Sequence, residues 1–322
     1  MAKISVVIPC YNAQDYIVRC LEALEQQSFK DFDVFCVNDC SSDNTEDVIR
    51  NYQKASDLDI HYLKNEVNSG PAYSRNNAIA QSTAEYICFC DSDDWYDEDF
   101  MECMVTAAKR NDADIVFCDY RMVWDSGKSL DHHSSMDEQT LCNNKLMIPQ
   151  STDSLWSMMV RRSIIAAIPQ PNLRNGEDMA IIPLLVAKAS HFCKVDKCIY
   201  NYLCREESAS NNASMKVVDS LVASYDHIKA NMPSGYESEI EFIGVRNLLY
   251  GALLILYKCS NDTPRAKKII ADFESAFPSW YNNKYLTILP KSKKIFLYFV
   301  HHRLFHVLKI LSVLHAYIVK NG

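Results

Sequence analysis

The chain has 322 residues, of which 48% are hydrophobic, and it carries a formal net charge of −8 at pH 7. This length allows one large domain or one domain with a smaller companion, and the apolar fraction is sufficient for a full core. The negative charge argues against broad non-specific binding of nucleic acid. The charge is uneven, because seven Lys and Arg and no acidic residue follow Glu274, which leaves −15 for the first 274 residues.

Several of the thirteen cysteines lie inside apolar runs, as Cys36, Cys88 and Cys118 do, where Cys behaves as a small hydrophobe. No C-x-x-C pair occurs, which argues against zinc ribbons and redox motifs, so we expect a reducing cytoplasm. The apolar run at the start is broken by Pro9 and lacks a small-residue cleavage site, so we expect no signal peptide. No uncharged run of about 18 apolar residues occurs, so we expect no membrane span.

The first 90 residues alternate short apolar runs with amphipathic segments. Strands are predicted at 4–10, 31–39, 60–65 and 85–90, and helices between them at about 12–24, 42–53 and 70–82. Asn12 is expected to cap the first helix, and Pro71 falls in the first turn of the third. Asp43 and Glu46 have the spacing of a capping box for the second. This alternation predicts an α/β fold with a parallel, doubly wound sheet, whose ligands bind beyond the carboxyl ends of the strands.

The pattern is less regular after Trp95. We expect a helix at 97–111, a strand at 113–123, a polar loop at 125–145, a helix at 176–190 and a strand at 198–205. Pro183 is expected to kink the second of these helices. From about Val217 onward the sequence predicts only helices, at 220–231, 239–259 and 263–276, followed by a basic tail at 291–322.

The basic tail predicts an amphipathic helix. One apolar stripe of this helix consists of Leu304, Leu308, Leu311, Leu314 and Ile318. Three lysines lie just before it, so the helix suits an anionic membrane surface. The alternative is a helix that packs on the catalytic domain or in a dimer interface, and the sequence leaves both open.

Several common nucleotide and catalytic motifs are missing. There is no G-x-G-x-x-G, and the Gly-Lys-Ser at 127–129 has Met122 where a P-loop needs glycine. No G-x-S-x-G and no H-E-x-x-H occur. His302 and His306 are one helical turn apart, which suits a metal, but a basic amphipathic face explains them better.

Asp91, Asp93 and Asp94 follow directly on the strand predicted at 85–90. Asp91 and Asp93 are two residues apart, so both can point the same way at the strand end. Carboxylates that converge repel each other unless a cation lies between them, and a hard divalent ion also accepts phosphate oxygens. A solvated acidic turn is the alternative.

The chain resembles the family 2 glycosyltransferases, which have the GT-A fold. The resemblance rests on four segments in the family's order and spacing, at 5–45, 68–79, 86–95 and 175–180. It is strong over about residues 3–205 and nearly absent over the helical tail. It implies a catalytic domain at 1–210 and a helical region at 211–322.

The resemblance also implies a nucleotide site at the sheet edge. Its cofactor-binding residues would be Pro9, Tyr11, Asn12, Asp39, Gly70, Arg75, Asp91 and Ser92. Tyr11 would stack on uracil and Asp39 would accept the uracil imide N–H, a role that suits a carboxylate because it only accepts. Arg75 would bond the diphosphate. The alternatives are packing of Tyr11 under the first helix, a turn cap for Asp39 and a structural salt bridge for Arg75. The family usually has Gly where this chain has Cys40.

The resemblance implies that Asp93 would ligate the metal directly. Asp91 would either hold the metal through water or hydrogen-bond the ribose, and Asp94 is the third choice. The metal would be Mg²⁺ or Mn²⁺, which an oxygen-rich site does not separate. Asp178 would be the catalytic base, with Glu177 orienting the acceptor, although acids at a helix start are favoured by the dipole in any case.

The acceptor side is less defined by the sequence. Trp156 and Arg161 or Arg162 fall where the family carries acceptor-side residues.

The implied function is inverting transfer of a sugar from a nucleotide sugar, most simply a UDP-sugar, to a saccharide or lipid-linked oligosaccharide in cell-surface polysaccharide synthesis. The location would be cytoplasmic, with peripheral contact at the inner face of the plasma membrane and a homodimer both left open. The alternatives are a nucleotidyltransferase, which normally needs a Gly-rich loop absent here, and a non-catalytic sugar-nucleotide-binding protein.

Overall fold

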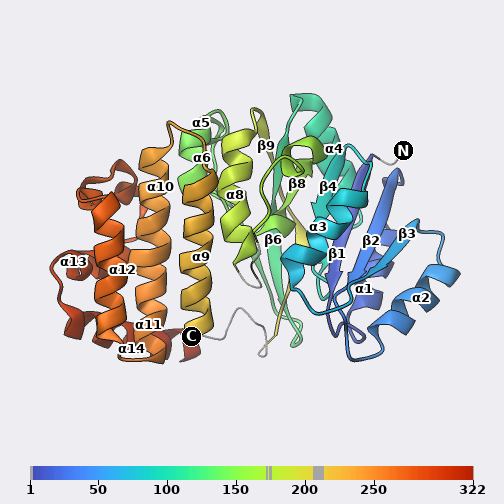
Figure 1. The fold of residues 1–322 in the computed structure, drawn as a ribbon. Helices are drawn as coiled ribbons and strands as arrows, with labels where there is room; N and C mark the ends of the chain where they lie inside the picture. Colours follow the sequence, from blue (N-terminus) through green and yellow to red (C-terminus); the bar gives the residue numbers. More distant parts are fainter. Residues whose placement is uncertain (1–2, 172, 174–175, 206–213, 322) are drawn as a thin grey trace. The chain divides into compact units, whose positions relative to one another are not determined.

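A computed structural model gives the fold, drawn in Figure 1. The structure describes residues 3–171, 173, 176–205 and 214–321, the last four of these without their side chains. The chain divides into two compact units, residues 1–208 and 209–322, and each is taken by itself. The predicted boundary between residues 210 and 211, and Asn175 in one of the family motifs, lie outside the described residues.

The first unit is built on a sheet whose N-terminal strands are those that the sequence predicts. The parallel part consists of β1 (Ile4–Cys10), β2 (Phe32–Asn38), β3 (Ile60–Lys64) and β4 (Tyr86–Phe89), in the order β3-β2-β1-β4. These strands are buried on both faces except at β3, which explains their continuous apolar sequences. The carboxyl ends of all four therefore meet at one edge.

The rest of the sheet is mixed, not parallel throughout. Its strands are β5 (Trp95–Tyr96), β6 (Ile115–Trp124), β7 (Ser129–His132), β8 (Met158–Arg161) and β9 (Phe192–Cys204). β8 lies antiparallel between β4 and β6, whereas β6 and β9 are parallel. β5 pairs antiparallel with β9, and β7 pairs antiparallel with β6.

The prediction of a loop at 125–145 is wrong in part. It contains β7, the helix α5 (Glu138–Leu141) and the start of α6 (Asn144–Gln150). All four residues of β7 are exposed, so no alternation of apolar and polar residues marks this strand in the sequence.

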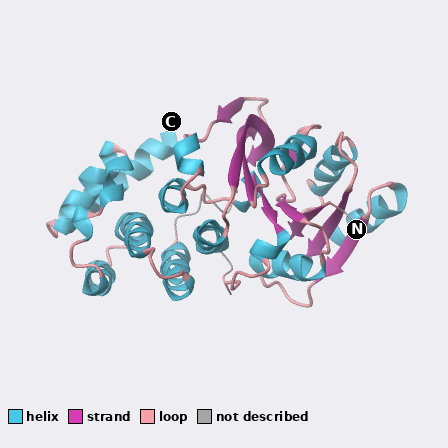
Figure 2. Ribbon diagram, turned by 90° about the horizontal axis from the view of Figure 1, so that it is seen from above, coloured by secondary structure: helices cyan, strands magenta, loops and turns pink. Residues whose placement is uncertain are grey.

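Helices lie on both sides of the sheet in the first unit (Figure 2). They are α1 (Ile17–Glu25), α2 (Thr45–Ala55), α3 (Pro71–Gln81), α4 (Phe100–Asn111), α7 (Arg162–Ile165) and α8 (Glu177–Lys188), with the 3-10 turn η1 (Leu155–Ser157). The main core forms where buried residues of α1 and α4 pack on β1, β2 and β4. Pro71 opens α3 and Pro183 lies inside α8, both as predicted.

The predicted cap at Asn12 is wrong, and the predicted capping box of Asp43 and Glu46 forms only in part. α1 begins only at Ile17, and the Asn12 side chain instead accepts a hydrogen bond from the Ser42 backbone N–H (2.9 Å). Asp43 accepts from the backbone N–H of Gln14 (3.2 Å), and Glu46 pairs with basic side chains rather than closing a capping box. These side chains tie the loop after β1 to the loop after β2. Asp43 also accepts from the backbone N–H of Thr45 (3.0 Å) at the start of α2, so it caps that helix without the reciprocal bond of a capping box.

The second unit is entirely helical in its described residues. Its elements are α9 (Met215–Asn231), α10 (Glu237–Gly244), the π-helix η3 (Val245–Ala252), α11 (Leu253–Cys259), α12 (Thr263–Ala276), η4 (Trp280–Asn282), η5 (Lys284–Ile288), α13 (Lys291–His301) and α14 (Phe305–Asn321). α10, η3 and α11 form one helix over Glu237–Cys259, which is long and apolar enough to cross a membrane by length and composition. This is weak evidence for a span, because 67% of its apolar window is buried, as in the core helix of a water-soluble domain.

The tail is two helices, not the single amphipathic helix that the sequence predicts. The chain breaks between α13 and α14, where Arg303 adopts a left-handed backbone (φ 57°) and pairs with Glu274. The predicted stripe does not form one face: Leu304 precedes α14 and is exposed, and within α14 Leu308 is buried against α11 while Leu314 is exposed. The Ile318 side chain lies outside the described residues.

Candidate active site

A buried arginine joins the end of β4 to the start of α8. The Arg75 side chain on α3 is only 6% exposed. Its Nη1 donates to Glu177 Oε1 (2.8 Å) and to Asp178 Oδ1 (2.9 Å), and its Nη2 donates to Asp91 Oδ1 (3.0 Å). Residues separated by 103 positions in the chain thus meet in one ionic cluster, and the proposed base lies one side chain away from the acidic loop.

The electrostatics of this cluster follow from burial. Desolvation alone lowers the pKa of Arg75, but the charges of Asp178, Asp91 and Glu177 outweigh it and raise the pKa, so the guanidinium stays charged. For Asp178 burial is the largest cause and raises its pKa, Arg75 lowers it, and Glu177 raises it again, which leaves the pKa at about 7. A carboxyl group that titrates near neutral pH is suited to take and release a proton.

Asp178 and Glu177 form the first turn of α8, after Gly176 in the left-handed conformation (φ 76°). Besides Arg75, Asp178 accepts from the Leu155 backbone N–H through Oδ2 (2.9 Å), so both of its oxygens are fixed in direction. The helix dipole favours acids at this position. The short sequence Gly-Glu-Asp therefore builds a turn that aims two carboxyl groups at Arg75.

The acidic loop after β4 contains three aspartates with different partners. Asp93 pairs with Arg205, and its backbone carbonyl accepts from Arg19 Nη2 (2.7 Å). Burial and then the neighbouring Asp91 raise the pKa of Asp93, against the effect of Arg205. Asp91 uses one oxygen for Arg75.

Asp94 is a structural residue in this loop. It is 1% exposed and accepts from the Tyr200 hydroxyl (2.6 Å) and from the Leu203 backbone N–H (2.7 Å). Burial, followed by Asp91 and Asp93, raises the pKa of Asp94 well above its usual range. Both of its oxygens are occupied by β9, so Asp94 anchors the loop to that strand.

The residues of the acidic loop fit a hard divalent cation. Within the part of the chain that the structure describes, Asp91 Oδ2 and Asp93 Oδ1 make no hydrogen bond to protein. The two side chains are 32% and 20% exposed, so these oxygens can be reached from solvent. All the donor atoms are oxygens, which suits Mg²⁺ or Mn²⁺ and not a thiophilic ion.

Asp39, at the end of β2, holds the turn that precedes α3. It is buried, and its carboxylate accepts from Asn65 Nδ2 (2.8 Å) and from the backbone N–H groups of Ser69 (3.0 Å) and Gly70 (2.7 Å). Gly70 has φ 89°, a conformation that other residues rarely adopt. Asp39 thus caps the turn, as the alternative in the sequence analysis proposed. Through this turn it positions α3 and Arg75.

The remaining predicted nucleotide residues lie along the same edge. Tyr11 is 52% exposed, so the alternative that it packs under the first helix is wrong. Pro9 lies within β1, Asn12 braces the loop of Ser42, and Ser92 is partly exposed beside the aspartates.

Of the predicted acceptor-side residues, the two arginines lie away from the acidic loop. Arg161 pairs with Tyr86, the first residue of β4, and Arg162 bonds the Ala84 carbonyl, both at the opposite end of the strand from Asp91. Trp156 is buried and stacks on Tyr200 with ring centroids 4.4 Å apart. The two arginines thus support the sheet, whereas Trp156 directly follows Leu155, whose backbone N–H contacts Asp178.

The sequence analysis missed two arginines at the acidic loop. Arg19 also stacks on Trp95 (4.0 Å), and Arg205 lies over the Tyr16 ring (4.6 Å). Arg205 directly follows the last strand, at the edge where ligands of such sheets bind, and that position is the signal that was available.

Comparison with known proteins identifies a family. The model described as "Glycosyl transferase family 2" matches residues 5–168, just over half of the chain. The "Putative teichuronic acid biosynthesis glycosyltransferase TuaG" of Bacillus subtilis is 29% identical over 209 residues, 65% of this chain and 82% of that protein. "Poly(ribitol-phosphate) beta-N-acetylglucosaminyltransferase TarS" of Staphylococcus aureus is 26% identical over 213 residues, 64% of this chain. The chain spans only 36% of TarS.

Solved structures show the same fold. TarS residues 1–349 of S. aureus, in complex with UDP-GlcNAc, superpose with a TM-score of 0.71 at 21% identity over 96% of this chain and 90% of that one. The mannosyltransferase PcManGT of Pyrobaculum calidifontis, in complex with GDP-Man and Mn²⁺, gives 0.59 at 13% identity over 98% and 86%. The predicted GT-A fold is confirmed, and the likeness in fold extends into the helical region, where the sequence resemblance is nearly absent.

Replacement of Arg75 by methionine should leave three carboxyl groups without their cation. We expect the free energy of unfolding to fall by about 3–5 kcal/mol at pH 8. Arg75 lowers the pKa of Asp178 in the folded protein, so without the guanidinium that pKa rises, ionisation opposes folding, and the loss should be smaller at pH 5 than at pH 8. Urea unfolding at the two pH values measures this, with Arg50→Met as the control because Arg50 forms an exposed pair with Glu46. Equal losses at both pH values would contradict the expectation.

Proposed function

The chain belongs to glycosyl transferase family 2, and from this we propose that it transfers a sugar from a UDP-sugar to an acceptor hydroxyl with inversion at the anomeric carbon. The observation that carries the proposal is the ionic cluster at Arg75, in which an acid with a pKa of about 7 faces the acidic loop across one buried guanidinium. Family membership gives the class of reaction, and the cluster supplies a base next to a site for a charged leaving group.

The donor is proposed to lie along the edge formed by the ends of β1, β2 and β4. Exposed Tyr11 is available to stack on the base, with Pro9 and Asn12 beside it, and Asp39 would accept the uracil imide N–H in addition to its turn contacts. The backbone at Gly70 and the side chains of Ser92, Arg75 and Asp91 would face the ribose and diphosphate. A uridine nucleotide is favoured because TarS is solved with UDP-GlcNAc.

A divalent cation is proposed to bind to Asp93 and Asp91, with diphosphate and water oxygens completing its coordination. When bound, it would neutralise negative charge that develops on the departing UDP. Support comes from the accessible oxygens of both aspartates and from the Mn²⁺ in the PcManGT complex. Arg205, which pairs with Asp93 here, is proposed to contact phosphate oxygens when the cation and diphosphate are bound.

Transfer is proposed as one in-line displacement. The acceptor oxygen forms a bond to the anomeric carbon while the bond from that carbon to the β-phosphate oxygen breaks, and the electron pair leaves with UDP. Asp178 takes the proton of the acceptor hydroxyl, and Glu177 helps to orient that hydroxyl. A single displacement inverts the anomeric centre, by the logic of inverting glycosidases.

Asp178 should govern the pH dependence of transfer. Because its pKa in the free protein is about 7, kcat/KM should rise about tenfold per pH unit below pH 7 and level off above it. Asp178→Asn should lower kcat by about 10²–10⁴-fold while UDP affinity changes little. UDP release measured from pH 5 to 9, with UDP binding by calorimetry, tests both. Normal transfer by Asp178→Asn would remove this residue from the mechanism.

Asp93→Ala should make transfer insensitive to added metal. Loss of a direct ligand is expected to lower activity at limiting Mn²⁺ by about 100-fold or more. Transfer is measured across a Mn²⁺ and a Mg²⁺ titration, with Asp125→Ala as the control, since Asp125 is exposed in the turn before β7. A variant with an unchanged metal response would rule out Asp93 as a ligand.

The acceptor is proposed to be a saccharide or a lipid-linked saccharide in the synthesis of a bacterial cell-surface polymer, carried out in the cytoplasm. The relatives named for teichuronic acid and poly(ribitol-phosphate) support this class of polymer. The family match speaks against the two alternatives, a nucleotidyltransferase and a non-catalytic binding protein. A panel of nucleotide sugars assayed for UDP or GDP release, followed by product analysis, tests the proposal and identifies the donor.

Peripheral contact with the membrane is proposed for α14. Four apolar side chains on this helix are more than half exposed, at the spacing of one helix face: Ile310, Val313, Leu314 and Tyr317. Lys309 adjoins them, and the tail has no acidic residue. An exposed apolar face with basic neighbours suits an anionic lipid surface, where a lipid-linked acceptor would be found.

The double variant Ile310→Glu/Tyr317→Glu should bind vesicles poorly. Burial of each apolar side chain is worth about 1.5 kcal/mol or more, so the partition coefficient on phosphatidylglycerol vesicles should fall about tenfold or more. Flotation measures it, with Val67→Glu/Tyr73→Glu as a control of equal charge at exposed positions of the first unit. Equal flotation of the two variants would exclude this face of α14.

A further inference from the structure

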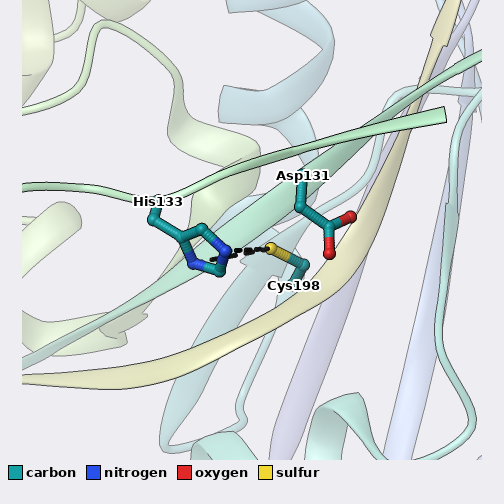
Figure 3. A group of neighbouring side chains, drawn as sticks. All are labelled: Asp131, His133 and Cys198. Carbon is teal, nitrogen blue, oxygen red and sulfur yellow. Dashed lines mark hydrogen bonds between the residues drawn. The ribbon is translucent and has the colours of Figure 1, made fainter.

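A second group of metal-ligating side chains lies away from the acidic loop. Asp131 is on β7, His133 follows that strand, and Cys198 is on β9 (Figure 3). One ligand atom from each residue lies within 4.8 Å of the others. β6 pairs with both β7 and β9, so the backbone of three strands holds the group together.

A β-bulge positions the cysteine of this group. β6 and β9 stay in register up to Cys118 and Val195, and the next pair is Asp119 with Cys198, which leaves two extra residues on β9. Bulges re-aim side chains and recur beside functional sites. Here Cys198, itself 5% exposed, turns its sulfur toward the His133 ring, and Sγ lies 3.9 Å from each ring nitrogen.

A buried carboxylate orients the histidine. Asp119, which is 1% exposed, bonds His133 Nδ1 through Oδ2 (2.8 Å), while its Oδ1 accepts from the Ser134 backbone N–H (2.9 Å) and pairs with Lys194 (2.9 Å). An acceptor with these donors is ionised, so Nδ1 carries the proton and Nε2 keeps its lone pair. Such a carboxylate behind a histidine is the usual arrangement around a metal-ligating imidazole.

We propose that Asp131, His133 and Cys198 form a site for a thiophilic divalent cation of the Zn²⁺ class. The donor set is one sulfur, one imidazole nitrogen and one carboxylate oxygen, which zinc accepts and Mg²⁺ does not favour. Ligands at about 2.3 Å and 2.1 Å in a tetrahedron lie about 3.5 Å apart. Sγ is now 3.9 Å from both ring nitrogens, so binding requires the exposed His133 ring to turn its Nε2 lone pair toward the ion. The Cys198 proton passes to solvent on binding, and water fills the fourth position.

Two of the three proposed ligands can be reached from solvent. Asp131 accepts from Arg121 Nε through Oδ1 (2.8 Å), which leaves its other oxygen for the metal. The side chains of His133 and Asp131 are 63% and 47% exposed, so the ion can enter from solvent. A bound ion would cross-link the β7 hairpin to β9.

The test uses the full-length protein, stripped with chelator and titrated with Zn²⁺ and Co²⁺. We expect one ion per chain, with a near-ultraviolet thiolate-to-Co²⁺ band that Cys198→Ser loses. His133→Ala and Asp131→Asn should weaken Zn²⁺ binding at least about tenfold. Because His133 is mostly exposed, we expect His133→Ala to fold. It therefore tests the site even if Cys198→Ser fails to fold.

Matched controls separate this site from chance binding and from the donor site. Cys142→Ser and His132→Ala remove an exposed cysteine and the neighbouring exposed histidine, and both should bind Zn²⁺ as the parent does. Asp93→Asn should also bind Zn²⁺ normally, since that residue lies in the acidic loop. Less than one equivalent of Zn²⁺ in the parent protein, or equal affinity in His133→Ala and His132→Ala, would overturn the proposal.

Discussion

The structure depends on how one buried guanidinium satisfies three carboxyl groups. Arg75 is fixed by its place on α3, and the turn before that helix is held in turn by Asp39. A buried charge is tolerated only when its partners are close and well aligned, and the planar fork of arginine offers nitrogens in two directions at once. A lysine would present one point charge and could not reach both Asp91 on one side and Asp178 on the other. The cluster therefore links the β4 edge to α8 through geometry that arginine alone supplies.

Burial and charge together set the pKa of Asp178. Burial raises it most, Arg75 lowers it, and the neighbouring carboxylates raise it again, which leaves the pKa at about 7. A short distance away, Arg205 and Arg19 offset the charge of Asp93 and its loop. In the proposed mechanism, this surplus of carboxylates would favour binding of the divalent cation, and the bound cation would in turn favour the diphosphate. Charge alone would account for that order and would need no change of fold.

The sequence predicts the fold well where buried segments give a recognisable pattern of apolar residues. β1, β2 and β4 are buried throughout and read as continuous apolar runs, whereas β7 has four exposed residues and gave no such mark. The tail was predicted as one helix because an apolar repeat does not reveal a left-handed residue such as Arg303. Asn12 was expected to cap a helix, but its bond to Ser42 depends on a loop 30 residues away. For the site, resemblance to the family selected Asp91 and Asp178, yet no spacing in the sequence predicts that Arg75 bridges them.

Two kinds of cation chemistry can coexist in this chain because the ligand atoms differ. The acidic loop offers only oxygens at the end of β4, which suits an abundant hard ion such as Mg²⁺. Asp131, His133 and Cys198 offer a mixed set that includes sulfur, which suits a scarcer, thiophilic ion. A chelator would empty both sites at once, so loss of transfer after chelation does not identify the ion that matters. Readdition of Mg²⁺ discriminates between the two proposed sites, because Mg²⁺ would refill the oxygen site and leave the thiolate site empty. Transfer that returns with Mg²⁺ alone would assign the catalytic requirement to the acidic loop. The site of Asp131, His133 and Cys198 would then have a structural role.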